Sequence, residues 1–146
     1  MKIELTKEQL GGLAKLVFLG NWLANSWRNE DVIGEYDEVE SLVLAEAAKH
    51  GFEEYAEFDE EEKKALPSHE LEEKLTETID FYNDNTFWDQ LIYRMADRDY
   101  VRKYGEEAFE ELTTDQGMEK ERPLVEKYEK EFNENGLDRL EVRRDN

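Results

Sequence analysis

The chain has 146 residues, of which 40% are charged and 12% aromatic, and its formal net charge is −20 at pH 7. A field of that sign repels nucleic acid and anionic lipid, so composition argues against direct binding to DNA or to a membrane surface. The chain has no cysteine, which excludes disulfides, thiolate nucleophiles and cysteine-ligated zinc.

The charge is unevenly spread. Residues 30–93 hold 21 acidic and four basic side chains, which gives that segment a net charge of −17. The apolar and aromatic content is still sufficient for a core, so we predict one folded domain spanning residues 1–146. No signal peptide is recognised at the amino terminus, and we expect a cytoplasmic protein.

The chain opens with alternating apolar and polar residues over 2–5, typical of a short strand. Residues 10–27 follow, an apolar run whose single charge is Lys15. Apolar residues recur at steps of three and four on more than one side of this run, which predicts a buried helix. We therefore expect a central apolar helix over about 6–29, begun by a capping box of Thr6 and Gln9.

Further helices are predicted over 37–50, after a capping box of Asp37 and Glu40, and from Ser68 to residue 82. The most acidic stretch, 52–66, has aromatics at three-residue spacing and predicts an amphipathic segment with a short helix before Pro67. A turn is expected at 83–85. Beyond it we expect helices over 86–104, 106–112 and 123–135, and a closing strand over 137–142, which could pair with the amino-terminal strand.

These elements predict a mostly α fold: a compact multi-helix bundle around the central helix, with a small two-stranded sheet from the two termini.

No motif for catalysis or metal binding is recognised. His50 follows Glu46 by four residues, whereas carboxylate di-iron proteins use a Glu-x-x-His spacing. No Gly-x-Ser-x-Gly turn, phosphate-binding glycine loop or calcium loop is present. We predict no metal and no cofactor, and no catalytic residue can be named.

Two candidate binding sites remain. The first is the acidic segment, where we expect contact charges and adjacent apolar anchors for a basic protein partner. The expected contact charges are Glu53, Glu54, Glu57, Glu60 and Glu61, and the expected anchors are Phe52, Tyr55 and Phe58. Such a protein could be an inhibitor, an immunity protein or a nucleic-acid mimic.

The second candidate lies on the central helix. Asn21, Asn25 and Arg28 fall at i, i+4 and i+7 and so share one face, next to Trp22. These side chains either hydrogen-bond a neighbouring turn or form a polar pocket for a small molecule, as in a binding protein or an enzyme. A third alternative is that the charge serves solubility alone.

Several stretches also resemble a known group of proteins. They are Leu19-Gly20-Asn21-Trp22 with Asn25 and Arg28 following, Tyr36-Asp37, Phe87-Trp88-Asp89-Gln90-Leu91 with Arg98-Asp99, and the Glu-rich run into Asn135-Gly136. Together they resemble a small family of acidic, uncharacterised bacterial helical proteins. That family has no assigned activity, so the resemblance implies a helical fold and carries over no functional residue.

Overall fold

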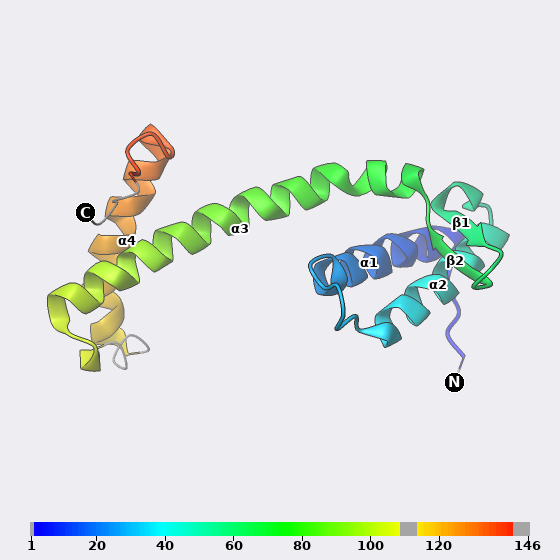
Figure 1. Cartoon of the computed structure of the whole chain (residues 1–146), viewed down its shortest axis with the longest axis horizontal. Helices are drawn as coiled ribbons and strands as arrows, with labels where there is room; N and C mark the ends of the chain where they lie inside the picture. The colour runs from blue at the N-terminus through cyan, green and yellow to red at the C-terminus, as the bar shows by residue number, and fades with distance from the viewer. Residues whose placement is uncertain (1, 109–113, 142–146) are drawn as a thin grey trace. The chain divides into compact units, whose positions relative to one another are not determined.

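A computed structural model describes residues 2–108 and 114–141, and it confirms the mostly α class. The described chain divides into two compact units, Met1–Phe81 and Tyr82–Asn146, here called the amino-terminal and carboxyl-terminal units. One domain over 1–146 stays a prediction. The elements in chain order are α1 (Lys7–Asn25), α2 (Gly34–Lys49), the 3-10 helix η1 (Glu53–Tyr55), β1 (Ala56–Asp59), β2 (Lys64–Pro67), α3 (His69–Tyr104) and α4 (Asp115–Asn135) (Figure 1).

In the amino-terminal unit α1 and α2 lie side by side, and the β1–β2 hairpin packs on α2 (Figure 1). The first turns of α3 complete the core of this unit. Its buried residues are Ala14, Phe18, Leu44, Ala47, Tyr55, Ala65, Leu71 and Leu75. Each helix contributes a stripe at steps of three and four, as the sequence pattern requires.

The start of α1 is as predicted. The Thr6 hydroxyl accepts a hydrogen bond from the backbone N–H of Gln9, and the Gln9 side chain accepts one from the backbone N–H of Thr6. The helix ends at Asn25, four residues before the predicted limit.

The burial predicted around most of this helix is not found. Ala14 and Phe18 face the core, whereas Leu16 is 67% exposed and Leu23 50%. The apolar run therefore has one face in the core and a second face in solvent.

A small sheet is present, but its predicted location is wrong. Residues 2–6 form no strand, and residues 137–140 form a turn; Val142 lies outside the described residues. The sheet is the antiparallel pair β1–β2, with Ala56 opposite Pro67 and Asp59 opposite Lys64.

The acidic segment is therefore a hairpin, and the short helix predicted before Pro67 is wrong. The carboxylate of Asp59 accepts the backbone N–H groups of Glu61 and Glu62, at 2.8 and 3.0 Å, and Lys63 takes a positive φ of 53°. These features close a tight turn, and the register of the two strands, not the three-residue spacing of the aromatics, sets the local structure.

The predicted turn at 83–85 is also wrong, since α3 runs without a break through Asn83, Asp84 and Asn85. Asn and Asp cost a helix under about 1 kcal/mol each. The stretch has no glycine or proline, the residues that most disfavour a helix. The residues of α3 on either side of it pack in the cores of the two units, and this packing outweighs the small cost. Its start agrees with the prediction, because the Ser68 hydroxyl accepts the backbone N–H of Leu71.

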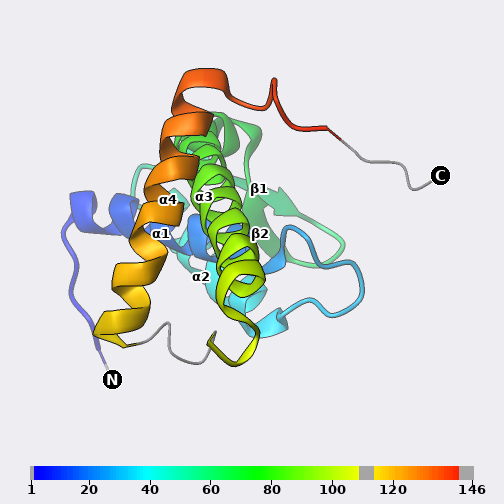
Figure 2. The same ribbon diagram turned by 90° about the vertical axis from the view of Figure 1, so that its left-hand side faces the viewer.

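The carboxyl-terminal unit pairs the second part of α3 with α4 (Figure 2). Ala96, Tyr128 and Phe132 are buried between the two helices, and Trp88 packs on Phe132 with ring centroids 5.9 Å apart. Thr114 caps α4, which begins eight residues before the predicted start at Pro123. Gly136 ends it as predicted. The short helix predicted over 106–112 lies partly outside the described residues.

Candidate functional site

The exposed face of α1 is apolar and regular. Its residues recur at steps of three and four and lie beside the core face, and they are Leu16, Val17, Gly20, Leu23, Ala24 and Trp27. Trp27, just past the end of the helix, is 69% exposed. An exposed stripe of this kind has the pattern of a helix that packs against another element.

α2 lies on one side of this face and supplies Tyr36 and Val39, spaced three residues apart on one side of the helix. The two helices enclose an open groove of about 590 Å³. It is lined by Val17, Gly20, Asn21, Leu23, Ala24, Tyr36 and Val39. Six of these seven residues are apolar or aromatic, or are glycine, so the groove is chiefly a hydrophobic surface.

The polar lining residue, Asn21, is bound to carboxylates of α2. Its Nδ2 donates to Asp37 Oδ1 at 2.9 Å and to Glu40 Oε2 at 2.8 Å. Glu40 is only 7% exposed. Burial raises the pKa of Glu40 to about 7, and the nearby Asp37 carboxylate adds to the rise, while the hydrogen bond from Asn21 opposes it.

The side chain of Asn25 holds the loop between the two helices by hydrogen bonds. Its Nδ2 donates to Asn21 Oδ1 at 2.7 Å and to the Ile33 carbonyl at 3.2 Å, and its Oδ1 accepts the Ile33 N–H at 2.9 Å. Ile33 is the N-cap of α2 and makes no side-chain cap hydrogen bond of its own. Asn25 therefore pairs the backbone N–H of the N-cap residue, one of the amide groups that a helix start leaves without an intrahelical partner.

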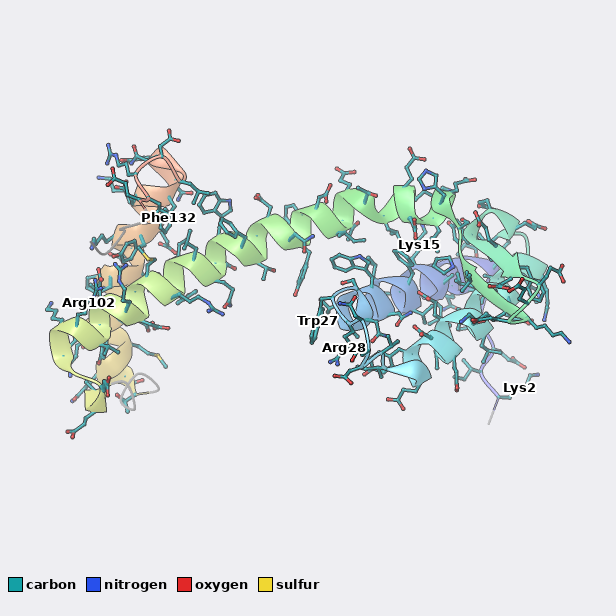
Figure 3. All side chains as sticks on the ribbon, in the orientation of Figure 1. Lys2, Lys15, Trp27, Arg28, Arg102 and Phe132 are labelled. Atoms are coloured by element: carbon teal, nitrogen blue, oxygen red, sulfur yellow. The ribbon has the colours of Figure 1, made fainter. Side chains whose placement is uncertain are left out.

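Arg28 hydrogen-bonds backbone carbonyl groups at the end of α1 and in the loop that follows. Its Nε donates to the Ala24 carbonyl at 2.9 Å and its Nη1 to the Asp31 carbonyl at 3.1 Å. Its guanidinium also lies 4.4 Å from the ring of Trp27 (Figure 3). Of the four residues predicted for a polar pocket, Asn21 lines the groove, Asn25 and Arg28 hold the loop, and Trp22 is half-buried outside the lining.

The predicted acidic site is only partly at the surface. Glu53, Glu57, Glu60 and Glu61 are exposed, and Glu54 is half-buried with its carboxylate 3.7 Å from Lys74 Nζ. Of the expected anchors, Tyr55 is wrong, because it is 6% exposed and lies in the core. Phe52 is half-buried and stacks on Tyr55 with ring centroids 5.1 Å apart. Both rings pack toward the core of the amino-terminal unit and not toward solvent.

Phe58 is the exposed aromatic of that segment, 60% accessible. It lines a second hollow of about 410 Å³ between α2 and the hairpin, together with Leu42, which is 71% exposed. Asp37, Glu38, Lys63 and Lys64 also line it. Because Leu42 follows Val39 by three residues, the apolar surface of α2 extends from the groove to this hollow.

The carboxyl-terminal unit has a cluster of charges around Asp99. Arg98 Nη2 lies 2.9 Å from its Oδ1, Lys127 Nζ lies 3.1 Å from its Oδ2, and the Tyr128 hydroxyl also donates to it. Burial alone would raise the pKa of Asp99, but hydrogen bonds from Tyr128, Arg98 and Lys127 outweigh it and hold that pKa well below its usual range. These groups satisfy one another, so the cluster joins α3 to α4.

Comparison with known protein families, curated proteins and solved structures finds no match for this chain. Within residues 2–108 and 114–141, no helix has both the length and the apolar character to cross a membrane. The same residues contain no cluster of three or more His, Asp or Glu side chains suited to a metal ion.

Sequence reasoning missed the groove residues Gly20, Leu23, Tyr36 and Val39 as a site. The stripe at steps of three and four was visible, but it predicted a buried helix. The available signal was that residues 10–27 carry apolar side chains on several sides of one helix, more than a single core face requires.

Proposed function

We propose that this chain is an acidic interaction protein that binds a basic protein partner through its amino-terminal unit. The observation that carries the proposal is the exposed apolar groove between α1 and α2, with Glu35 and Glu38 exposed along α2 beside it. Contiguous apolar surface with a polar rim is the usual anatomy of a protein interface.

The charge of the amino-terminal unit supports a basic partner. Residues 1–81 contain 21 acidic and eight basic side chains, which gives a net charge of −13. A field of this sign speeds association with a positively charged protein and disfavours acidic partners. The exposed carboxylates of the hairpin, Glu57, Glu60 and Glu61 among them, add to that field.

The groove and the hairpin have different roles in this proposal. Desolvation of the groove residues supplies affinity, because a few buried apolar and aromatic side chains usually dominate binding energy. Exposed rim charges act mainly on the association rate. Trp27 and Tyr36 are residue types enriched among such dominant contacts.

A small-molecule site is the alternative, and the groove volume lies in the range of such sites. Small-molecule sites usually add a few polar groups that orient the ligand. Here the side-chain nitrogen of Asn21 already donates to Asp37 and Glu40. The groove therefore suits a protein surface better than a small polar ligand.

The test begins with capture from host lysate at low salt, elution in a salt gradient and identification by mass spectrometry. The purified partner is then titrated against the chain at several salt concentrations. We expect one stoichiometric basic protein whose affinity falls as salt rises. An acidic or neutral partner, or an affinity that does not change with salt, would contradict the proposal.

Two variants separate the roles. Leu23→Ser, which removes apolar surface from the groove, should raise the dissociation rate. Glu57→Lys combined with Glu60→Lys should mainly slow association at low salt. Circular dichroism checks that both variants keep the fold.

A further inference from the structure

We infer that the groove between α1 and α2 receives an amphipathic α-helix of the partner, with its apolar face on α1 and a basic flank toward α2. This inference rests on the proposed function and adds the shape and the orientation of the segment that binds. It is drawn from three features of the amino-terminal unit: the glycines of α1, the pattern of its exposed face and the distribution of charge around the groove.

The glycines of α1 are the first feature. A Cβ on Gly11 would lie 2.5 Å from the Phe52 ring, so packing within the protein accounts for that glycine. A Cβ on Gly20 would meet nothing within 4 Å. Glycine is, after proline, the least favourable residue inside a helix, and no contact of the described fold requires one at position 20. Gly12 is equally open, so openness alone does not single out Gly20. Gly20 is the one of the two that lines the groove, where close approach by another chain would explain a glycine.

The shape of the exposed face is the second feature. Gly20 and Ala24 leave a shallow notch between the larger side chains of Val17 and Leu23. A large apolar side chain of a facing helix fits such a notch, as ridges of one helix fit grooves of another. From Leu16 to Asn25 the helix rises about 14 Å at 1.5 Å per residue, which matches about two and a half turns of a partner.

Charge around the groove is the third feature, and it fixes the orientation. On the α1 side, Lys15 is the only charge between residues 10 and 27, and its Nζ lies 5.8 Å from the Tyr55 ring, over the core. On the α2 side, Glu35 and Glu38 are exposed. A partner helix with Lys or Arg on the flank toward α2 therefore matches both sides.

The same charges disfavour a second copy of this chain as the occupant. Two amino-terminal units would each bring a net charge of −13 to the contact. Like charges of that size repel at short range. The negative charge of this unit attracts a basic helix and repels a second copy of the chain.

The probe is a peptide of about 18 residues made of Leu and Lys, with Leu at i, i+3, i+4 and i+7 so that it forms an amphipathic helix. A peptide of the same composition in scrambled order has the same charge without the apolar face. Binding of each labelled peptide is measured by fluorescence anisotropy at low and at moderate salt. We expect the patterned peptide to bind roughly tenfold more tightly or better, and its advantage to persist at moderate salt.

Gly20→Leu fills the notch, and Gly12→Leu is its matched control, because a Cβ on Gly12 also meets nothing within 4 Å and Gly12 does not line the groove. Both variants should fold. We expect Gly20→Leu to weaken binding of the patterned peptide roughly tenfold or more and Gly12→Leu to leave it unchanged.

Three outcomes would overturn the inference. Equal binding of both peptides, unaffected by Gly20→Leu, would mean attraction by charge alone; the groove site would then be wrong, and the basic partner would stand. Binding of neither peptide at low salt would contradict the basic partner as well. Dimerisation in sedimentation velocity that Gly20→Leu abolishes would assign the groove to a second copy.

Discussion

Gly11 and Gly12 are neighbours in α1 but have different surroundings, and substitution at each should act in opposite directions. A Cβ at position 11 would collide with the Phe52 ring, which is stacked on Tyr55, whereas position 12 is open. We expect Gly11→Ala to lower the free energy of unfolding by about 1–3 kcal/mol through overpacking. Gly12→Ala should raise it by about 0.5–1 kcal/mol through helix propensity. Urea denaturation measures both, and destabilisation by both would contradict the geometry.

Glu40 gives a second prediction at this scale. Its pKa in the folded protein is about 7, above its ordinary value of 4.5. The stability that its protonated form contributes is therefore complete below about pH 4.5 and is lost as pH rises through 7. Glu40→Gln keeps a neutral group under the groove, so it should raise the free energy of unfolding by about 1–3 kcal/mol near pH 8 and have little effect near pH 4.

The control for this experiment is Glu38→Gln, an exposed residue two positions away on the same helix. Thermal unfolding is followed from about pH 4 to pH 8 for wild type and both variants. A loss of stability near pH 8 in Glu40→Gln would show that the charged carboxylate is favoured in the fold, against the prediction.

Most helix caps could be predicted from the sequence, whereas side-chain contacts between residues far apart in the chain could not. Thr6, Ser68 and Gly136 act where their chemistry placed them, because a cap depends on residues within four positions. The capping box predicted for Asp37 and Glu40 is wrong, since α2 already begins at Gly34 and both carboxylates accept the side-chain nitrogen of Asn21. Asn25 pairs the backbone N–H of Ile33, eight residues later, and the path of the loop between them cannot be read from the sequence. Its role as a loop fastener or as a pocket residue could therefore not be decided from periodicity.

At the scale of elements, α4 contains a proline whose removal should stabilise the protein. Pro123 lies in the ninth position of the helix, well inside it. It has no N–H to donate, and its ring crowds the carbonyl of Glu119 four residues before. Pro123→Ala should raise the free energy of unfolding by about 1–2 kcal/mol, part of the gain being offset by a freer unfolded chain. Arg122→Ala, an exposed neighbour, is expected to change it little, and urea denaturation compares the two.

The pairing of α3 with α4 gives another prediction. Asp99 accepts hydrogen bonds from Arg98, Lys127 and Tyr128. Asp99→Asn should lower the free energy of unfolding by about 1–3 kcal/mol, because the two cations lose a charged acceptor. Since the pKa of Asp99 is held below its usual range, this contribution should be present at neutral pH and fall away as pH drops below about 4.

Asp97→Asn is the matched control, since burial raises the pKa of Asp97 and no hydrogen-bond partner lowers it. Its neutral analogue should be tolerated or mildly favourable at neutral pH. Equal losses in both variants, measured by thermal unfolding, would argue against a special role for Asp99.

Helix existence could be predicted from the sequence better than helix limits. α1 and α2 follow from apolar periodicity, and Gly51, at a φ of 87°, ends the second where expected. The hairpin was missed because Phe52, Tyr55 and Phe58 at three-residue spacing also fit a helix, and strand pairing with 64–67 is a non-local choice. The break at 83–85 was predicted from turn-forming residues that a long helix tolerates when both of its ends are packed.

At the scale of the whole molecule, the net charge opposes the self-association that exposed apolar surface favours. A charge of −20 keeps copies of the chain apart, while Leu16, Leu23, Trp27 and Val39 each leave at least half of their surface to solvent. The sequence indicated the charge directly. It could not indicate which of two apolar faces of α1 is buried, because that depends on how many neighbours pack against the helix.

The most direct test of the helix-in-groove account is chemical-shift mapping by NMR on the full chain labelled with nitrogen-15. The patterned basic peptide is titrated at moderate salt, and the backbone amide shifts are followed residue by residue. We expect the largest changes to cluster over residues 16–27 and 35–43 and to be absent with the scrambled peptide. Changes spread over the acidic hairpin and the exposed carboxylates, with the groove residues unmoved, would contradict it.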